Sequence, residues 1–123
     1  MRTLIATVFN CSLDGLLADP GTDFWEFCFS LPENQKPDDP AQLDFIRGAD
    51  AHLFGRNAYE SIAESMTTVA ADHPFADILN AAPKVVFSRT LATATWANTT
   101  IASGDTAEEV EVLRRGGDGY LIV

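Results

Sequence analysis

Gly55 and Arg56 are the residues of this sequence whose type and position best suit the binding of a ligand. They follow His52 and the apolar residues Leu53 and Phe54, and they precede residues 59–63, where apolar side chains recur at helical spacing. Residues 49–62 are therefore expected to form a short buried strand, a tight turn and the start of a helix. The N–H groups of a helix start carry the positive end of the helix dipole, so a phosphate can dock there beside Arg56. The alternative is an ordinary strand-to-helix turn with a surface arginine, which is common in α/β proteins.

A second group of polar residues follows another apolar run. Residues 84–88 predict a strand, and Arg89 and Thr90 lie just beyond its end. The first apolar run, residues 3–9, is likewise followed by a loop at residues 10–15. Loops after the carboxyl ends of parallel strands meet at one edge of a sheet, so these loops and the turn described above are expected to share one rim. Two arginines, hydroxyl groups and helix N–H groups suit a phosphate monoester together with a pyrophosphate, the anions of NADP.

The charge of the chain makes such an anion site depend on local basic residues. The 123 residues carry a formal charge of −10, which argues against nucleic acid or an anionic membrane as a partner. Only eight residues are lysine or arginine, and Arg56, Lys84 and Arg89 all adjoin predicted strands, which supports a local anion pocket. No segment has the length of a membrane span, and the two cysteines match no metal or redox spacing. We expect a cytoplasmic protein.

The rest of the chain alternates predicted strands with predicted helices. Residues 3–9 are apolar nearly throughout and are expected to form a central strand buried on both faces. Residues 24–31 are crowded with aromatic side chains, which either cover a pocket or plug one end of the core. The alternation predicts an α/β fold of three layers, αβα, with a largely parallel central sheet and one domain over residues 1–123. The other expected strands are 96–103 and 120–123, and the expected helices are 40–48, 56–66, 75–79 and 108–115.

Three motifs, in this order, resemble the dihydrofolate reductase-like fold. They are Ser12-Leu13-Asp14-Gly15, the turn Gly55-Arg56-Asn57-Ala58-Tyr59-Glu60, and the segment Lys84-Val85-Val86-Phe87-Ser88-Arg89-Thr90-Leu91. Within that fold the sequence is most similar to the group that includes the reductase domain of the bifunctional riboflavin-biosynthesis deaminase-reductase. The resemblance covers the chain from the first strand to Val123.

The resemblance implies that the turn at Gly55 receives the phosphates of NADPH. Arg56 would then lie near the 2′-phosphate, with Asn57 and Ala58 at the pyrophosphate. The family usually has threonine where this chain has Ala58. This difference removes one hydroxyl ligand but keeps the backbone N–H group.

Two further parts of the cofactor site follow from the same resemblance. The adenosine side, including the 2′-phosphate, would be contacted by Ser88, Arg89 and Thr90. The nicotinamide and substrate pocket would be lined by Ala6, Thr7, Asp14 and Gly15. The family continues beyond the strand at residues 120–123 into a Gly-Gly turn, a helix and further strands, so this chain is expected to be an incomplete, truncated form of the fold.

The expected function is an NADPH-dependent reductase of a small conjugated substrate, pterin-like or similar to a pyrimidine precursor of riboflavin. Hydride transfer needs no protein nucleophile or metal because the cofactor carries the chemistry, and the sequence has neither a catalytic triad nor a zinc-deaminase motif. The candidate proton donors are Asp14, Asp39 and Asp44, although Asp39 also fits a helix N-cap. The alternative is a non-catalytic nucleotide-binding or dimerising module of the same fold. The apolar strand at residues 120–123 needs sheet partners, from a continuing chain or from a second copy in a homodimer.

Overall fold

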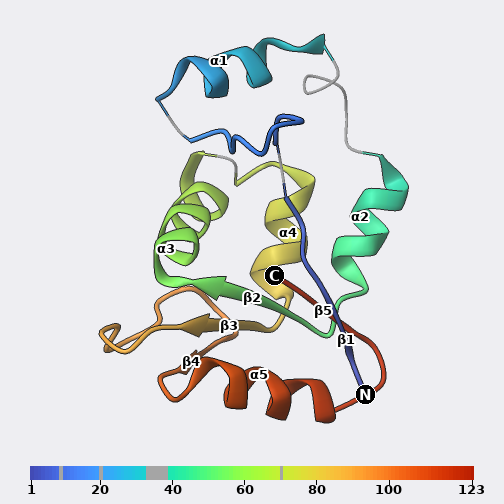
Figure 1. Ribbon diagram of the computed structural model, residues 1–123, viewed down its shortest axis with the longest axis vertical. Coiled ribbons are helices and arrows are strands. Elements are labelled where there is room, and N and C mark those ends of the chain that lie inside the picture. The colour runs from blue at the N-terminus through green and yellow to red at the C-terminus, as the bar shows by residue number, and fades with distance from the viewer. Residues whose placement is uncertain (9, 20, 33–38, 70) are drawn as a thin grey trace. The chain divides into compact units, whose positions relative to one another are not determined.

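The computed structural model describes residues 1–123 with the exception of residues 9, 20, 33–38 and 70. The chain divides into two compact units, one formed by Met1–Ala6 with Pro40–Val123 and the other by Thr7–Asp39. The first unit contains the strands β1 (Thr3–Ile5), β2 (Ala51–Gly55), β3 (Lys84–Phe87), β4 (Thr99–Ala102) and β5 (Tyr120–Ile122) (Figure 1). Its helices are α2 (Pro40–Arg47), α3 (Arg56–Glu64), the π-helix η2 (Ser65–Val69), α4 (Pro74–Ala81) and α5 (Thr106–Arg115).

The sheet of the first unit has the strand order β1-β5-β2-β3-β4, and all of these neighbours pair in parallel. The prediction of an α/β fold with a largely parallel sheet is therefore confirmed. β5 lies between β1 and β2 and pairs with both, and its Leu121 is fully buried. The apolar strand near the end of the chain thus finds both of its sheet partners within the same chain.

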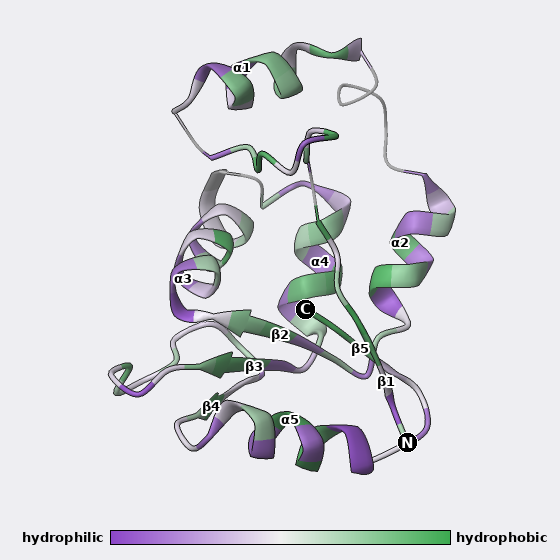
Figure 2. Cartoon of the chain, in the orientation of Figure 1, coloured by the Kyte–Doolittle hydropathy of each residue, from purple (hydrophilic) through white to green (hydrophobic). Residues whose placement is uncertain are grey.

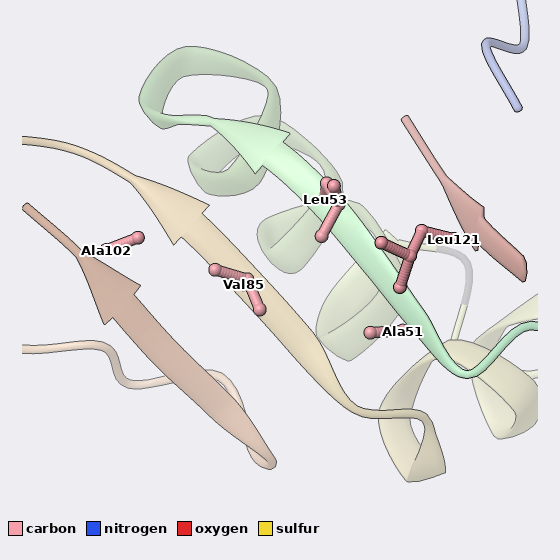
Figure 3. Close-up of a cluster of buried hydrophobic side chains, with 5 residues drawn as sticks. All are labelled: Ala51, Leu53, Val85, Ala102 and Leu121. Atoms are coloured by element: carbon pink, nitrogen blue, oxygen red, sulfur yellow. The ribbon is translucent and has the colours of Figure 1, made fainter. Parts of the chain in front are cut away.

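One face of the sheet is covered by α5. The buried side chains on this face come from four neighbouring strands, as Figure 3 shows; they are Ala51, Leu53, Val85, Ala102 and Leu121. Val110 and Leu113, which are three residues apart on α5, pack against this cluster. Asp105 caps the helix by accepting hydrogen bonds from the backbone N–H groups of Ala107 and Glu108. Acidic residues follow in the first turn and arginines in the last, as the helix dipole favours.

The opposite face of the sheet is covered by α3 and α4 (Figure 1). Val86 points to this face because successive residues of a strand alternate in direction. It packs with Tyr59 of α3 and with Trp96, and Ile62 and Leu79 of the two helices close the cluster. Figure 2 shows that the strands between the two helical layers are mostly hydrophobic, whereas hydrophilic residues recur along α5. This arrangement explains why a nearly continuous apolar pattern marks β3 and β5.

β1 differs from the predicted central strand over residues 3–9. The strand covers only Thr3–Ile5, lies at the edge of the sheet, and leaves Thr3 and Leu4 exposed. Phe9 lies outside the described residues. The crossover through α5 returns the chain between β1 and β2, so β5 takes the inner place. An apolar run by itself does not distinguish an edge strand from a central one.

Among the other elements, two differ most from their predicted bounds. The strand expected at residues 96–103 covers Thr99–Ala102, while Trp96 lies buried in the core and its backbone N–H donates to the hydroxyl of Tyr59 at 2.9 Å. The short helix expected at residues 75–79 extends over Pro74–Ala81. In the described part of the chain, none of the helices has the length and apolar character needed to cross a membrane.

The second unit contains a tight turn and one helix. Cys11 and Leu17 form an antiparallel bridge around the turn, and Gly15 has a positive φ of 89°, which glycine adopts without strain. The loop predicted at residues 10–15 therefore contains this tight turn. The aromatic segment forms α1 (Asp23–Ser30), a helix that the sequence pattern did not predict, with Thr22 as its N-cap. The idea that these rings cover a pocket stays a prediction.

Candidate functional site

The predicted strand and helix on either side of Gly55 are confirmed, but the strand passes directly into the helix without the tight turn expected between them. β2 ends at Gly55, and α3 begins with Arg56. Gly55 has an ordinary extended conformation, with φ of −73° and ψ of 162°, and provides no side chain to cap the helix. A Cβ atom added at Gly55 would meet no atom within 4 Å, so the start of α3 is open. Asn57 and Ala58 are exposed in the first turn, where helix N–H groups lack partners within the helix.

The loop after β3 is shaped by Ser88. Its backbone N–H donates to the carbonyl of Ala102 at 3.0 Å, which continues the pairing of β3 with β4. Its hydroxyl oxygen accepts hydrogen bonds from the backbone N–H groups of Thr90 at 3.3 Å and Leu91 at 3.0 Å. Ser88 therefore closes a tight turn that leaves Arg89 and Thr90 exposed at its tip.

Arg56 joins the two motifs. Its Nη1 donates to the hydroxyl oxygen of Thr90 at 2.7 Å, a contact between residues 34 apart in the sequence. Its Nε donates to Oε1 of Glu60 at 3.0 Å, forming an ion pair between side chains that are 43% and 49% exposed. The contact with Thr90 is possible because β2 and β3 are adjacent, with Gly55 in register with Phe87. The sheet topology thus brings the carboxyl ends of β2 and β3 to one rim, as predicted.

Arg89 belongs to the same loop as Thr90. Its side chain is exposed, and no hydrogen bond or ion pair holds its guanidinium within the described parts of the chain. Arg56 at the start of α3 and Arg89 in the loop after β3 thus place two cationic residues at neighbouring positions of the rim. This is a local concentration of positive charge in a chain with a formal charge of −10.

Lys84 does not belong to this rim, contrary to the expectation that it contributes to a local anion pocket. It begins β3, whereas the candidate site lies at the strand's other end. Its Nζ donates to the carbonyl oxygens of Leu79 at 2.5 Å and Ala82 at 2.7 Å and lies 4.6 Å from the ring centroid of Trp96. The side chain is only 1% exposed, and burial lowers the pKa of Lys84 from 10.5 to about 8.

His52 is a buried residue of β2, and it lies in register with Lys84. Its Nε2 is 3.1 Å from the carbonyl oxygen of Ile46. Burial lowers the pKa of the ring, and the nearby charge of Lys84 lowers it further, whereas the hydrogen bond to Ile46 opposes the shift. The neutral ring, donating from Nε2 to the carbonyl, satisfies this environment. His52 therefore has a structural role at the centre of the first unit.

The three candidate proton donors differ in their surroundings. Asp14 is exposed in the turn of the second unit, and a hydrogen bond from the hydroxyl of Ser12 lowers the pKa of its carboxyl group. Asp44 is exposed on α2 and forms an ion pair with Nη1 of Arg47 at 2.6 Å. Asp39 is exposed and directly precedes α2.

The residues expected around the nicotinamide come from both units. Ala6 directly follows the carboxyl end of β1, and Gly55 is the carboxyl end of β2. Both residues therefore lie at the same end of the parallel strands, with β5 between β1 and β2. Thr7, Asp14 and Gly15 belong to the second unit and are described within it. The structure therefore brings together the residues predicted at the phosphates, whereas the residues predicted at the nicotinamide and substrate are divided between the two units.

Two hollows lie in the first unit. One, of about 530 Å³, is lined by Arg47, Ala49 and Pro83 among others, at the amino ends of β2 and β3 and so at the edge opposite Gly55. The other, of about 280 Å³, lies along α3 and is lined by Glu60 and Trp96 among others. The second hollow therefore adjoins the Arg56 ion pair.

Glu60 is the residue of this site to which sequence reasoning assigned no role. It lies four residues after Arg56 on α3, which is the spacing of ion pairs along a helix. That spacing was visible in the sequence once a helix was predicted to begin at Arg56. The orientation of the Arg56 side chain, by contrast, depends on Thr90 from another element.

Comparison with known proteins does not identify a family for this chain. No protein-family model matches the sequence, and no curated protein matches it. The topology of the sheet establishes an α/β protein with a mostly parallel sheet.

Proposed function

We propose that this chain is an NADPH-dependent reductase with a dihydrofolate reductase-like fold, acting on a small conjugated substrate of pterin or riboflavin-precursor type. The observation that carries the proposal is the 2.7 Å hydrogen bond between Arg56 and Thr90. It links the two motifs that resemble the phosphate and adenosine sides of an NADPH site. The open rim of a parallel sheet, next to a helix start, is also where α/β proteins commonly bind nucleotides.

The charges of the site favour a cofactor with an additional phosphate. The chain as a whole repels anions, so an anionic cofactor requires the local positive charge of Arg56 and Arg89. In the proposed complex these arginines hold the 2′-phosphate, and the backbone N–H groups of Asn57 and Ala58 face the pyrophosphate. Gly55 leaves room for the cofactor because nothing fills the position of its missing Cβ.

NADPH would supply the hydride, which leaves to the protein the tasks of binding, orientation and protonation. A general acid works best when its pKa lies near the working pH. Asp14 has a lowered pKa, and Asp44 is ion-paired with Arg47. We therefore assign neither of these two carboxylates the role of proton donor in the proposed reaction.

Cofactor binding tests the proposal directly. NADPH and NADH are titrated against tryptophan fluorescence in the wild type and in Arg56→Ala. The substitution is expected to weaken NADPH binding by roughly 1.5 to 3 kcal/mol, the range of hydrogen bonds to charged groups, and to change NADH binding little. Arg47→Ala is the matched control, because Arg47 is also an exposed, ion-paired helical arginine but lies on α2. Equal losses for both cofactors in Arg56→Ala would contradict the proposed role of Arg56.

Activity separates the reductase from a binding module. Oxidation of NADPH is followed at saturating cofactor with pterin, flavin and pyrimidine substrates. Saturable quenching by NADPH without oxidation in any of these mixtures would favour the non-catalytic nucleotide-binding module. The homodimer and the cytoplasmic location expected from the sequence stay predictions, and sedimentation of the purified chain measures the oligomeric state.

A further inference from the structure

The ion pair between Glu60 and Arg56 bears on how the proposed site selects its cofactor. Glu60 lies one helical turn after Arg56, and its Oε1 is 3.0 Å from Nε of Arg56. Thr90 holds Nη1 of the same guanidinium from the loop after β3. The guanidinium is therefore held from two sides by two different elements. Its Nη2 has no hydrogen-bond partner among the residues that the structure describes and is available to a ligand.

The carboxylate of Glu60 also alters the charge that a ligand meets. It offsets the positive charge of Arg56, so that among these residues Arg89 is the arginine whose charge is not balanced by an ion pair. An anion bound by Nη2 of Arg56 is attracted by the guanidinium and repelled by the carboxylate. This repulsion increases with the charge of the anion, and it is therefore greater for a phosphate monoester than for a hydroxyl group in the same place.

We infer that Glu60 is a specificity-determining residue that limits the preference of this site for a cofactor carrying a 2′-phosphate. The inference rests on the proposed function, since it concerns the same NADPH site. Glu60 keeps Arg56 in position while reducing the net charge that the extra phosphate meets. A site with Arg56 and without this carboxylate discriminates more strongly between NADPH and NADH.

The decisive variant is Glu60→Gln. Glutamine keeps a side-chain oxygen that can accept the hydrogen bond from Arg56, but it carries no negative charge. NADPH binding is expected to tighten by about three- to fivefold, as for the removal of one partly screened charge near a dianion, with a smaller change for NADH. This gain in NADPH affinity should shrink at about 1 M salt, where the Debye screening length is only about 3 Å.

Glu64→Gln is the matched control. Glu64 is an exposed glutamate on the same helix, one turn beyond Glu60, and its substitution changes the net charge of the chain equally. It lies farther along α3 from Arg56. A general effect of net charge would appear in both variants, whereas the inferred effect appears in Glu60→Gln and is smaller in Glu64→Gln. Circular dichroism and thermal melting verify that both variants are folded.

The outcomes distinguish the inference from the proposed function. If the wild type does not bind NADPH, the proposed function fails, and the inference fails with it. If the wild type binds NADPH and Arg56→Ala loses it selectively, the proposed site stands. The inference on Glu60 is then overturned if Glu60→Gln binds NADPH no more tightly than Glu64→Gln does. A ratio of NADPH to NADH affinity that rises in Glu60→Gln alone, and falls back at high salt, supports it.

Discussion

The burial of Lys84 makes the free energy of unfolding of this protein vary with pH in the alkaline range. Its side chain is 1% exposed, and its Nζ contacts two backbone carbonyl oxygens and the ring of Trp96. None of these groups carries a full negative charge, so burial dominates and lowers the pKa of Lys84 to about 8. The carbonyls lie at the end of α4, where the negative end of the helix dipole partly compensates for the lost solvation.

The sign of the effect follows from proton binding. In the unfolded chain the pKa of a lysine is near 10.5, so between pH 8 and 10.5 the unfolded state holds a proton that the folded state has released. Stability must therefore rise with pH across this window. The difference between 10.5 and about 8, at about 1.4 kcal/mol per pKa unit, corresponds to about 3 kcal/mol in the free energy of unfolding. This destabilisation is fully present below pH 8 and is lost as the pH approaches 10.5.

The measurement compares the wild type with Lys84→Met, which keeps an unbranched apolar side chain but cannot titrate. Urea unfolding is followed by tryptophan fluorescence at intervals from pH 7 to pH 10. Tyrosine and other groups titrate in both proteins, so the difference between the two free energies of unfolding isolates Lys84. We expect this difference to shift in favour of the wild type by about 2 to 3 kcal/mol over the range. A difference that does not change with pH, or that moves in the opposite direction, would refute the reasoning.

Two further predictions concern packing. Gly119→Ala should lower the free energy of unfolding by about 1 to 3 kcal/mol, because its Cβ would lie 2.7 Å from the carboxylate of Asp50. Gly55→Ala creates no such contact, so it should leave stability unchanged and weaken NADPH binding. Equal melting temperatures for these two variants would contradict the expected crowding at Gly119. Tyr59→Phe should lower the free energy of unfolding by about 1 to 3 kcal/mol, since it leaves the buried backbone N–H of Trp96 without its acceptor. Chemical denaturation measures this loss, and an unchanged denaturation midpoint would exclude it.

The parts of the fold that were predicted correctly rest on local patterns. β2 and the start of α3 follow from an apolar run, a glycine and helical spacing within a few residues. The helix expected at residues 108–115 is α5, and its start is set equally locally, because the side chain of Asp105 accepts hydrogen bonds from the N–H groups of the residues that follow it. The α1 helix was missed because its aromatic residues crowd the segment without a clear apolar stripe.

The sequence predicted which residues belong to the candidate site better than it predicted which of them are in contact. The sequence placed Arg56 and the loop at Arg89 and Thr90 after two strands, and the rule that parallel strands end at one edge was sufficient to expect them together. It did not reveal that Thr90 is the residue that meets Arg56 or that Glu60 shares the guanidinium. Those contacts depend on the side-by-side placement of β2 and β3, which lie about thirty residues apart in the chain.

By itself, the amino-acid sequence determined the alternation of strands and helices, the composition of the loops and the overall negative charge. These properties depend on neighbouring residues or on simple sums. The tertiary structure alone decided that β5 lies inside the sheet and β1 at its edge, and that Lys84 is buried at the end of α4 rather than at the rim that carries Arg56 and Thr90. The physical reason is that strand order and the direction of a long side chain are chosen by packing between distant segments, which a local apolar pattern does not encode.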